Sequence, residues 1–263
     1  ITVKESAPDN SFEVILFAGT ENVVGDPIRI VISKGISTAD DFMKIRENYY
    51  GYYILKNDID FNYEGGEHTL FTPFPVFYGV LEGNGYQIKN VMFDTFSSAK
   101  DYGLIIENHG VIQNVVLTTT ISFYDDPGKE IRYVGGFSAV NYGVIRDCSI
   151  SSFGYFFVDN EGSYVGGIVG MNAGLITGCS NYVTIFGNKF VGGVAGYNQG
   201  RIEYSVNARN IIVREASEPS ETSGVVGFNA GEVFSCGHLE SIFVGIHDYT
   251  ISEYEDAEEN SDS

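Results

Sequence analysis

The chain of 263 residues has no tryptophan, only 6 prolines and no long uninterrupted hydrophobic run. Without a run of about 18 apolar residues, we expect no helix that spans a membrane. Basic residues are also scarce: 15 Lys and Arg stand against 35 Asp and Glu, which gives a net charge of -20. This charge repels the phosphates of nucleic acids and anionic membrane surfaces. We therefore expect neither a nucleic-acid partner nor membrane insertion.

The chain also lacks an initiating methionine and an apolar signal region, since it begins at Ile1. This start predicts a processed or trimmed piece of a longer protein, and we expect a monomeric module of that larger chain. Cysteine is rare as well. The 3 cysteines, Cys148, Cys179 and Cys236, are odd in number and show no metal-ligand spacing.

Glycine and the aromatic residues are plentiful by contrast. There are 32 Gly, 18 Tyr and 19 Phe, and 43% of the residues are hydrophobic. Aromatic residues favour strands, glycines favour tight corners, and the hydrophobic content suffices for a large core. The composition therefore predicts an all-β protein.

A recurring phrase organises the chain after residue 100. Each copy has an Asn with a Gly two residues later, another Gly five residues before it, and an Ile or Val four residues after it. The Asn residues of the copies are Asn108, Asn141, Asn172, Asn198 and Asn229. Because no copy can bury its apolar face alone, the copies must stack. We predict a coil of parallel strands in which each copy forms one rung.

The repeated residue types have distinct physical roles in such a stack. Gly accepts the positive φ of a turn without steric cost, and Asn can bond its own turn backbone. Stacked turns also let successive Asn side chains form an amide ladder. A double glycine, such as Gly166 with Gly167, lets one rung approach the next closely. The alternative, a phosphate-binding loop, needs a following helix and usually a Lys, and neither follows any copy.

The three cysteines share one position in the repeat. Each lies seven residues after the Asn of its copy, where Val115 and Ser205 stand in the other copies. A position that Cys shares with Val indicates a small, buried and inert thiol. We therefore expect the cysteines to line up inside the stack. The alternative is a functional thiol, or a bridge between Cys148 and Cys179 on neighbouring rungs.

One segment before the repeat predicts a cap. Residues 38–49 are expected to form a helix that Ser37 or Thr38 caps, with Phe42 and Ile45 on its apolar stripe. An open stack of strands exposes unpaired backbone at its ends, and this helix would cover one of them.

These features divide the chain into three parts. We expect residues 1–35 to supply strands of a cap or of the edge of a preceding domain. Residues 36–250 should form the coil, with about six or seven rungs at the usual strand spacing. Residues 251–263 are acidic and without apolar anchors, so we expect a disordered tail or linker.

The segments VGGIVGMNAGLITGCS and VGGVAGYNQGRIEYS resemble the repeat of the GLUG-motif family. The stretch from ISTADDFMKI through YILKNDIDF to FYGVLEGNGYQIKNV looks like the region that often precedes such repeats in secreted bacterial proteins, so the resemblance covers roughly residues 36 to 240. The match departs from the motif where its leucine position holds Phe137, Ile168, Val194 or Val225, and where Ala139 replaces its last glycine.

The resemblance implies a right-handed parallel β-helix on a bacterial cell surface. The family occurs in adhesin-like proteins and in the non-catalytic N-terminal regions of some immunoglobulin A peptidases. It implies no catalytic residues to carry over to this chain. The zinc motif His-Glu-x-x-His of metallopeptidases is also absent from the sequence.

We therefore predict a secreted or wall-displayed bacterial module that is not an enzyme. It would act as an adhesive spacer that binds a host glycan or surface protein. The alternative is an accessory or substrate-docking domain of a secreted peptidase or carbohydrate-active enzyme, or a β-helix glycosidase or lyase itself. Such an enzyme needs two carboxylates about 5 to 10 Å apart. The candidate pairs are Asp58 with Asp60 and Asp125 with Asp126.

The same four aspartates are candidate ligands for Ca²⁺, the only cofactor we consider, because carboxylates supply the hard oxygen ligands that this ion prefers. No EF-hand or nonapeptide calcium repeat accompanies them. The candidate binding residues lie in FGYFFVDNEGS, an excursion between rungs that we expect to be a loop. They are Phe153, Tyr155, Phe156 and Phe157, whose rings could stack on a sugar or fill a pocket of a partner. The alternative is that half of them pack onto the coil.

Overall fold

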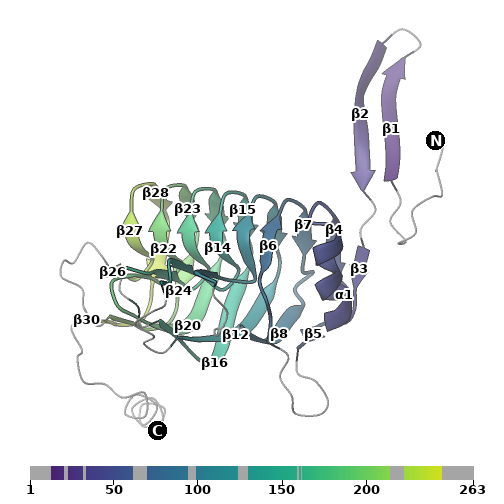
Figure 1. Cartoon of the computed structure of the whole chain (residues 1–263). Coiled ribbons are helices and arrows are strands. Elements are labelled where there is room, and N and C mark those ends of the chain that lie inside the picture. The colour runs from purple at the N-terminus through teal and green to yellow at the C-terminus, as the bar shows by residue number, and fades with distance from the viewer. Residues whose placement is uncertain are drawn as a thin grey trace.

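The computed structural model describes residues 13–20, 23–31, 34–61, 70–93, 99–123, 130–158, 160, 162–213 and 222–244. These residues form an all-β protein, a parallel β-solenoid with one short helical segment near the N-terminus (Figure 1). The predicted fold class is confirmed. Outside the coil, β1 (Glu13–Thr20) and β2 (Val23–Val31) pair with each other in an antiparallel sheet.

Four parallel sheets run along the coil. The six-stranded sheet contains β6 (Phe74–Phe77), β10 (Ile105–Asn108), β14 (Ser138–Asn141), β18 (Val169–Asn172), β22 (Ala195–Asn198) and β27 (Val226–Asn229). The eight-stranded sheet contains β3 (Lys34–Ile36), β4 (Tyr52–Leu55), β7 (Val80–Glu82), β11 (Val111–Gln113), β15 (Val144–Arg146), β19 (Leu175–Thr177), β23 (Arg201–Glu203) and β28 (Glu232–Phe234).

The other two sheets complete each rung. The nine-stranded sheet contains β5 (Ile59–Asp60), β8 (Gln87–Met92), β12 (Val116–Phe123), β16 (Ser149–Val158), β20 (Ser180–Gly187), β24 (Val206–Asn207), β25 (Ile211–Val213), β29 (Gly237–His238) and β30 (Ile242–Val244). The five-stranded sheet contains β9 (Asp101–Tyr102), β13 (Tyr133–Val134), β17 (Tyr164–Gly166), β21 (Phe190–Gly192) and β26 (Thr222–Ser223).

A complete rung visits the five-, six-, eight- and nine-stranded sheets in that order, as β17 to β20 do. The five-stranded sheet has one strand from each complete rung, so the coil has about five complete turns. The predicted six or seven rungs comprise these complete turns and the incomplete rungs that precede them. Strands β4 to β8 belong to the coil, but they precede β9 and have no partner strand in the five-stranded sheet.

The Asn residues of the repeat form the predicted amide ladder. The side-chain nitrogen of each Asn donates to the side-chain oxygen of the next. The distances are 2.8 Å from Asn108 to Asn141, 2.8 Å from Asn141 to Asn172, 2.9 Å from Asn172 to Asn198 and 2.8 Å from Asn198 to Asn229. The first four side chains are fully buried, and the last is exposed on the final rung. The ladder fixes the register, because a slip would leave buried amides unpaired.

A second, shorter ladder was not predicted. Asn181 donates to Asn207 over 2.7 Å, and the side-chain nitrogen of Asn207 lies 2.8 Å from Nδ1 of His238. The same column holds Leu117 and Ile150 in the earlier rungs. The interior therefore changes from apolar to polar toward the C-terminal end of the coil.

The glycines of the repeat allow the close approach that the sequence predicts. A Cβ added to Gly166 would lie 2.6 Å from the backbone Cα of Ala195 in the next rung, and one added to Gly174 would lie 2.1 Å from the backbone oxygen of Gly143 in the rung before. Real Cβ atoms do not approach backbone atoms this closely, so these positions accept only glycine unless the backbone moves.

Each rung also contains a left-handed corner that was not predicted. It lies six residues after the Asn of the repeat. The residues are Asn114 with φ 54°, Asp147 with 51°, Gly178 with 64°, Tyr204 with 50° and Ser235 with 50°. Asn, Asp and Gly tolerate this region, whereas a bulky residue such as Tyr204 adopts it at a cost in backbone strain.

The cysteine column lies immediately after these corners. Cys148 and Cys179 are buried on neighbouring rungs, in register with each other, because the N–H of Ser180 donates to the oxygen of Cys148 over 2.9 Å. Both thiols are free, and so is the half-buried Cys236 on the last rung. Burial, followed by contact with Cys179, raises the pKa of Cys148 well above its ordinary value. The predicted column of small, buried residues is confirmed for Cys148 and Cys179, and the inertness of their thiols stays a prediction.

The predicted capping helix is present but shorter than expected. An α-helix, α1 (Ala39–Met43), continues as a 3₁₀ turn, η1 (Lys44–Glu47), in place of one helix over residues 38–49. Thr38 is the N-cap, and its hydroxyl accepts the N–H of Asp41 over 3.1 Å.

The capping helix covers the interior of the first rungs. Phe42 of α1 is fully buried and lies within 5.5 to 6.5 Å, ring centroid to centroid, of Phe61, Phe71 and Phe74. The predicted boundaries at residues 35 and 250 stay predictions, and the predicted tail at 251–263 lies outside the described residues.

Candidate functional site

The aromatic segment predicted as a binding loop is part of a strand. Phe153, Tyr155, Phe156 and Phe157 all belong to β16. Phe156 is fully buried in the core, so the expectation that it contacts a ligand at the surface is wrong. Tyr155 and Phe157 are half-buried, and the side chain of Phe153 lies outside the described residues. Whether the surface members of this set bind a ligand stays a prediction.

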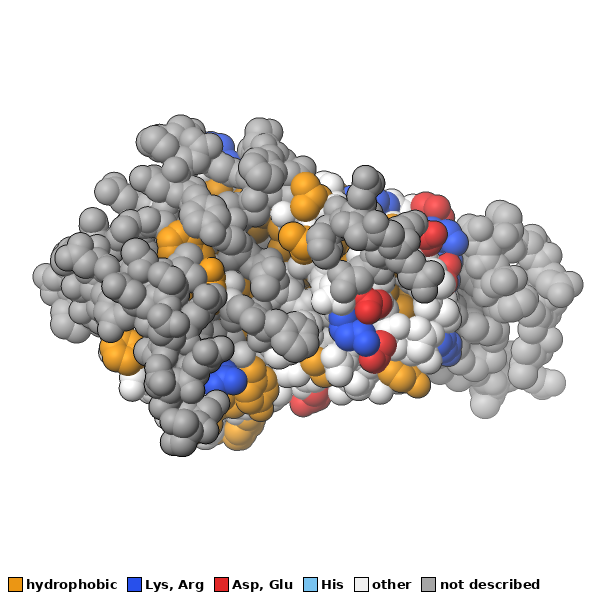
Figure 2. All heavy atoms as spheres, turned by 90° about the horizontal axis from the view of Figure 1, so that it is seen from below, with side chains coloured by type: hydrophobic (Ala, Val, Ile, Leu, Met, Phe, Trp, Pro, Cys, Tyr) orange, Lys and Arg blue, Asp and Glu red, His pale blue; other side chains and the backbone are white. Residues whose placement is uncertain are grey.

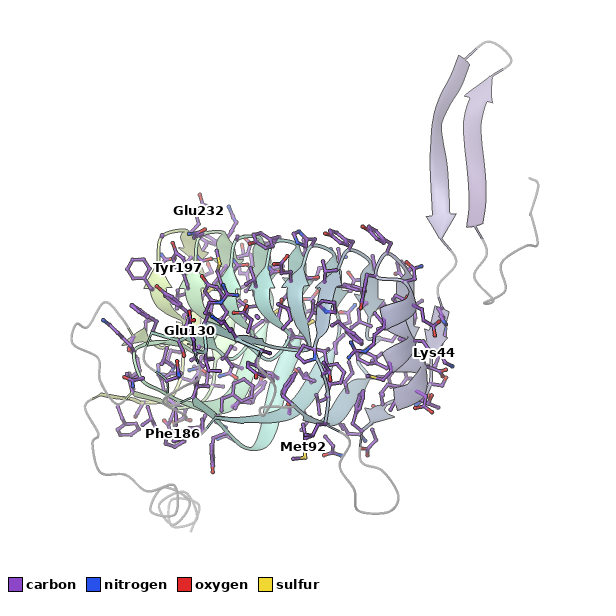
Figure 3. All side chains as sticks on the ribbon, in the orientation of Figure 1. Lys44, Met92, Glu130, Phe186, Tyr197 and Glu232 are labelled. Atoms are coloured by element: carbon purple, nitrogen blue, oxygen red, sulfur yellow. The ribbon has the colours of Figure 1, made fainter. Side chains whose placement is uncertain are left out.

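The reason for this placement is the alternation of a strand. Phe156 and Val158 point inward, and Tyr155 and Phe157 point to the outer face. There the two outer rings contact Phe186 of β20, with centroids 5.3 Å from Tyr155 and 6.1 Å from Phe157. The rings of this lower cluster, which Figure 3 marks with Phe186, therefore pack largely on one another.

The first predicted carboxylate pair lies at the edge of the nine-stranded sheet. Asp58 accepts hydrogen bonds from the N–H of Gln87 over 3.0 Å and from Nζ of Lys89 over 3.1 Å. These two contacts, in that order, lower the pKa of Asp58. Asp60 accepts from the side chain of Asn90 over 2.7 Å. On the face seen from below, acidic and basic side chains lie beside one another nearer the N-terminal end (Figure 2).

The second predicted pair, Asp125 with Asp126, lies outside the described residues. Within the part of the chain that the structure describes, no group of three or more His, Cys, Asp and Glu side chains converges in the way that a metal ion requires. The calcium hypothesis for Asp58, Asp60, Asp125 and Asp126 therefore stays a prediction.

A buried carboxylate that the sequence did not indicate lies in the eight-stranded sheet. Glu82 on β7 is 9% exposed. It accepts hydrogen bonds from the N–H of Asn84 over 2.7 Å and from the side chains of Gln113 over 2.5 Å and Asn114 over 3.0 Å. Burial alone would raise the pKa of Glu82, but these donors together with the nearby Arg146 outweigh it, so the pKa lies below its ordinary value. An ionised, fully hydrogen-bonded carboxylate is structural and is no general acid at neutral pH.

This carboxylate should make stability depend on pH. Because the pKa of Glu82 is lowered in the folded chain, its contribution is present above the unfolded pKa of about 4.3 and is lost as the pH falls through the folded value. We expect Glu82→Gln to lower the free energy of unfolding at pH 7 by about 1–2 kcal/mol. Near pH 3 the difference in this free energy between the variant and the wild type should be smaller. Urea unfolding at both pH values measures this. A difference between variant and wild type that is the same at both pH values would contradict this prediction. Glu240→Gln, which changes an exposed side chain, serves as the control.

Outward-facing rings gather in one place, which we call the aromatic strip. It consists of Tyr133, Tyr164, Phe190, Tyr197 and Phe228. The ring centroids lie 5.7 Å apart between Tyr133 and Tyr164, 4.5 Å between Tyr164 and Phe190, 5.4 Å between Tyr164 and Tyr197, and 5.5 Å between Tyr197 and Phe228. Figure 3 shows Tyr197 on the upper half of the coil, away from Phe186 and the lower cluster.

The repeat itself places these rings. Tyr133, Tyr164 and Phe190 each stand directly before the Val that precedes a double glycine, and they pair in register along the five-stranded sheet. The following Val points inward, so the ring must point outward. Tyr197 and Phe228 come from the neighbouring six-stranded sheet, where they pair with each other.

The strip is amphipathic. All of its rings except Phe228 are half-buried, and Phe228 is 41% exposed. Nζ of Lys189 lies 5.1 Å from the ring centroid of Phe190, within the range of a cation–π contact. Burial, followed by the neighbouring Tyr164, raises the pKa of Tyr133, so its hydroxyl is a neutral hydrogen-bonding group. Rings with polar tips of this kind suit a surface that contacts a partner.

A separate row, which we call the ring ladder, runs along the turns between the six- and eight-stranded sheets. Tyr50, Tyr78, His109 and Tyr142 stack face to face, with centroid separations of 4.8, 4.9 and 4.8 Å in that order. Tyr50, Tyr78 and Tyr142 are 72%, 44% and 48% exposed. The sequence carries a signal for this row, because His109 and Tyr142 each follow the Asn of their copy.

Comparisons with known proteins add a structural likeness. No protein-family model and no curated protein matches the chain. A crystal structure from Bacteroides ovatus, of a protein provisionally named as an immunoglobulin A1 protease, matches with a TM-score of 0.50 and 17% sequence identity. The match covers 82% of this chain and 78% of that chain. At this identity the likeness shows a shared fold alone.

The resemblance of the repeat to the GLUG-motif family therefore stays a prediction. The helical segments α1 and η1 are short, and no helix within the described ranges has the length and apolar character needed to cross a membrane.

Proposed function

We propose that this chain is a non-catalytic binding module of a secreted or surface-displayed bacterial protein, and that it holds a partner protein against the aromatic strip. The observation that carries the proposal is the strip itself, in which Tyr133, Tyr164, Phe190, Tyr197 and Phe228 from two sheets form one contiguous outward surface. Aromatic residues dominate the binding energy of protein interfaces, because they bury a large area while fixing few rotatable bonds.

The construction of the coil supports this role. The rings of the strip stand on stacked parallel strands whose register is held by the buried Asn ladder. A surface of this kind is ordered before a partner arrives, so little conformational entropy is lost on binding. The net charge of -20 favours a partner whose contact surface is neutral or basic.

Two biological settings fit such a module. As an adhesive spacer, the chain would hold a host surface protein at a distance from the bacterial cell. As a docking domain of a secreted peptidase, it would hold the substrate of a catalytic domain elsewhere in the longer protein. The second setting is favoured by one observation, the name of the Bacteroides ovatus protein that shares the fold.

The experiment is a binding screen against purified extracellular host proteins, immunoglobulin A1 among them. We expect a partner to be retained by the wild type and to bind at least about tenfold more weakly to the double variant Tyr133→Ser with Tyr164→Ser. Tyr182→Ser, which changes a tyrosine that is 46% exposed on β20, should bind like the wild type. Melting curves verify that both variants fold.

Two results would overturn the proposal. One is a partner that binds the strip variant as tightly as the wild type, because the docking surface would then lie elsewhere. The other is cleavage of a screened protein by the chain alone, because the module would then be catalytic. Retention of immunoglobulin A1 in particular would favour the peptidase setting over the adhesive one.

A further inference from the structure

The two ends of the coil differ. At the N-terminal end, Phe42 of α1 covers the interior. Figure 1 shows β27 and β28 at the opposite end of the coil from α1. Within the described residues, the four parallel sheets end at the final rung, which spans 222–244, with β26, β27, β28 and β29 as their last strands. Each of these strands therefore has one edge whose backbone N–H and C=O groups face no partner strand.

The interior of the coil is exposed on the final rung. Val233 continues the column of Ile176 and Ile202 and is in register with Ile202. Both isoleucines are 0% exposed, whereas Val233 is 41% exposed. Cys236 is half-buried, although Cys179 in the same column is fully buried. The final rung thus presents the surface that each earlier rung buries against its successor.

The long Asn ladder ends on this rung with a donor that has no acceptor in a further rung. The side-chain nitrogen of Asn198 donates to Oδ1 of Asn229 over 2.8 Å and to the backbone oxygen of Glu232 over 3.2 Å, both one rung further on. Among the described residues, the same nitrogen of Asn229 donates to Gly231 of its own turn alone. One amide hydrogen of Asn229 is therefore left for an acceptor beyond the final rung.

His238 ends the shorter ladder in a similar way. Oδ1 of Asn207 accepts from the side chain of Asn181 and from the N–H of Arg209, so Nδ2 of Asn207 is the donor to Nδ1 of His238. The proton of the neutral imidazole must then lie on Nε2. In the part of the chain that the structure describes, this Nε2 is buried and has no hydrogen-bond partner. A buried donor without an acceptor destabilises the rung that carries it.

The final rung also lacks the residues that usually protect an exposed sheet edge. Proteins protect such edges with Lys, Pro or inward-pointing charges. Residues 222–244 contain no Lys, Arg or Pro, and their acidic residues are Glu232 and Glu240. Glu232 is in register with Arg201 of the preceding rung, whose guanidinium lies 3.2 Å from the Glu232 carboxylate. A basic residue on the other side of Glu232 would be favoured for the same reason.

We propose that the final rung binds an extended segment of a partner polypeptide, which adds one more parallel rung to the coil. The segment carries the phrase of the repeat. Its Asn accepts from Asn229, its Gly two residues later permits close approach, its basic residue lies beside Glu232, and its Ile or Val covers Val233. Backbone hydrogen bonds to the free edges of β27 and β28 supply affinity, and these side chains supply specificity.

A second copy of this chain fits the final rung less well. Its N-terminal end is covered by α1, which leaves its own final rung to meet the first. Two identical surfaces meet across a two-fold axis, and strands that face each other across such an axis run antiparallel. The Asn ladder joins parallel strands, as in the pairing of Asn198 with Asn229. An antiparallel pairing does not extend it.

This site goes beyond the proposed function, because it uses the end of the coil and not the aromatic strip. Phe228 belongs to the strip and lies on β27, so it is left unchanged in both experiments. The double variant Tyr133→Ser with Tyr164→Ser should bind the segment like the wild type. The absence of a partner for the strip would therefore leave the end site standing, and the reverse also holds.

The probe is a synthetic peptide of sequence VGGVAGYNQGRIEYSVN, which reproduces residues 191–207 of this chain. NMR with the whole isotope-labelled chain follows its binding through the backbone amide signals of the final rung. Because the free peptide must become ordered, we expect a Kd of about 100 µM. The same residues in reverse order should not bind, since they keep the composition but lose the spacing of the phrase. A peptide with Asn198→Leu lacks the ladder acceptor and should bind at least about tenfold more weakly.

Two variants on one strand test the location. Val233→Lys places a charge on the exposed interior face and should abolish binding of the peptide. Phe234→Lys places the same charge on the neighbouring residue of β28, which is 54% exposed and points to the outer face, and it should retain binding. Melting curves verify that both variants fold. If Val233→Lys disturbs folding, Asn229→Leu removes the ladder donor and should weaken binding at least about tenfold.

Any of three results would overturn the proposal. The first is the absence of shifts in the wild type at about 1 mM peptide. The second is binding that persists in a folded Val233→Lys variant, or equal binding of the reversed peptide, because the phrase would then not be recognised at this end. The third is a dimer in sedimentation that Val233→Lys converts to a monomer, because a second copy would then cover the final rung.

Discussion

Replacing Gly174 by alanine is expected to destabilise the coil by about 3–5 kcal/mol. The added Cβ would lie 2.1 Å from the backbone oxygen of Gly143 and 2.7 Å from the backbone carbon of Tyr142. Both atoms belong to the rung below. A Cβ added to the glycine of that rung, Gly143, would likewise lie 2.1 Å from the backbone oxygen of Gly110. A shift that relieves one contact would therefore disturb the hydrogen bonds of the next rung. Urea unfolding measures the change in free energy.

Gly237→Ala is the matched control. A Cβ at Gly237 would meet nothing nearer than a methyl carbon of Val206 at 3.9 Å. Because Ala restricts the unfolded chain more than Gly does, this variant should change the free energy of unfolding by no more than about 1 kcal/mol. A Gly174→Ala variant that unfolds at the same urea concentration as Gly237→Ala would mean that the rungs are not packed as closely as the structure describes.

The fold could be predicted from the sequence because each rung repeats the same turn and the same stacking contacts. Asn172 and Gly174 recur at fixed offsets since the turn needs them, and stacking then requires the same residues in the next rung. Cys179 could be placed in the core because Val occupies its position in another copy. In a solenoid, a residue contacts chiefly its counterparts in adjacent rungs, so aligned copies already predict most contacts along the coil.

The sequence predicts the structure less well where the copies of the repeat differ from one another. Before β9 the rungs lack a strand of the five-stranded sheet. The sequence does not mark this difference, because Gly103 and Gly224 are single glycines in copies that do have this strand. The left-handed corner was missed because only Gly178 marks it with a glycine, whereas Tyr204 and Ser235 give no signal. Residue identity is a poor guide where tertiary packing holds a residue in a strained conformation.

The candidate sites were harder to predict for a different reason. The segment around Phe156 contains Gly154, a residue type that suits a turn as well as a strand, so the sequence left open whether its rings lie in a loop or half of them pack onto the coil. The aromatic strip joins Tyr164 to Tyr197, which lie in different rungs and in different sheets. Such a surface depends on the angle at which the five- and six-stranded sheets meet at each corner. The amino-acid sequence alone does not give that angle.

Replacing Asn172 by aspartate is expected to destabilise the coil about as much as Gly174→Ala does. Its amide nitrogen donates to the side-chain oxygen of Asn198 over 2.9 Å, to the backbone oxygen of Gly174 over 3.2 Å and to that of Arg201 over 3.3 Å. A carboxylate would turn an oxygen toward these three acceptors in a fully buried position. We expect a loss of about 3–5 kcal/mol at pH 7, because a buried charge would be left without a donor on that side.

The pH dependence of this variant identifies the cause. The surrounding acceptors favour the protonated acid, so the pKa of the new carboxyl should be raised in the folded chain, and its penalty should be absent below the unfolded value of about 3.9. Unfolding free energies should therefore recover, relative to the wild type, by up to about 1.4 kcal/mol per pH unit as the pH falls. Asn229→Asp ends the ladder at an exposed position, where the acid keeps the bond from Asn198, and should cost less than about 1 kcal/mol. Equal losses in the two variants, or no recovery in acid, would mean that the ladder does not set the register of the rungs.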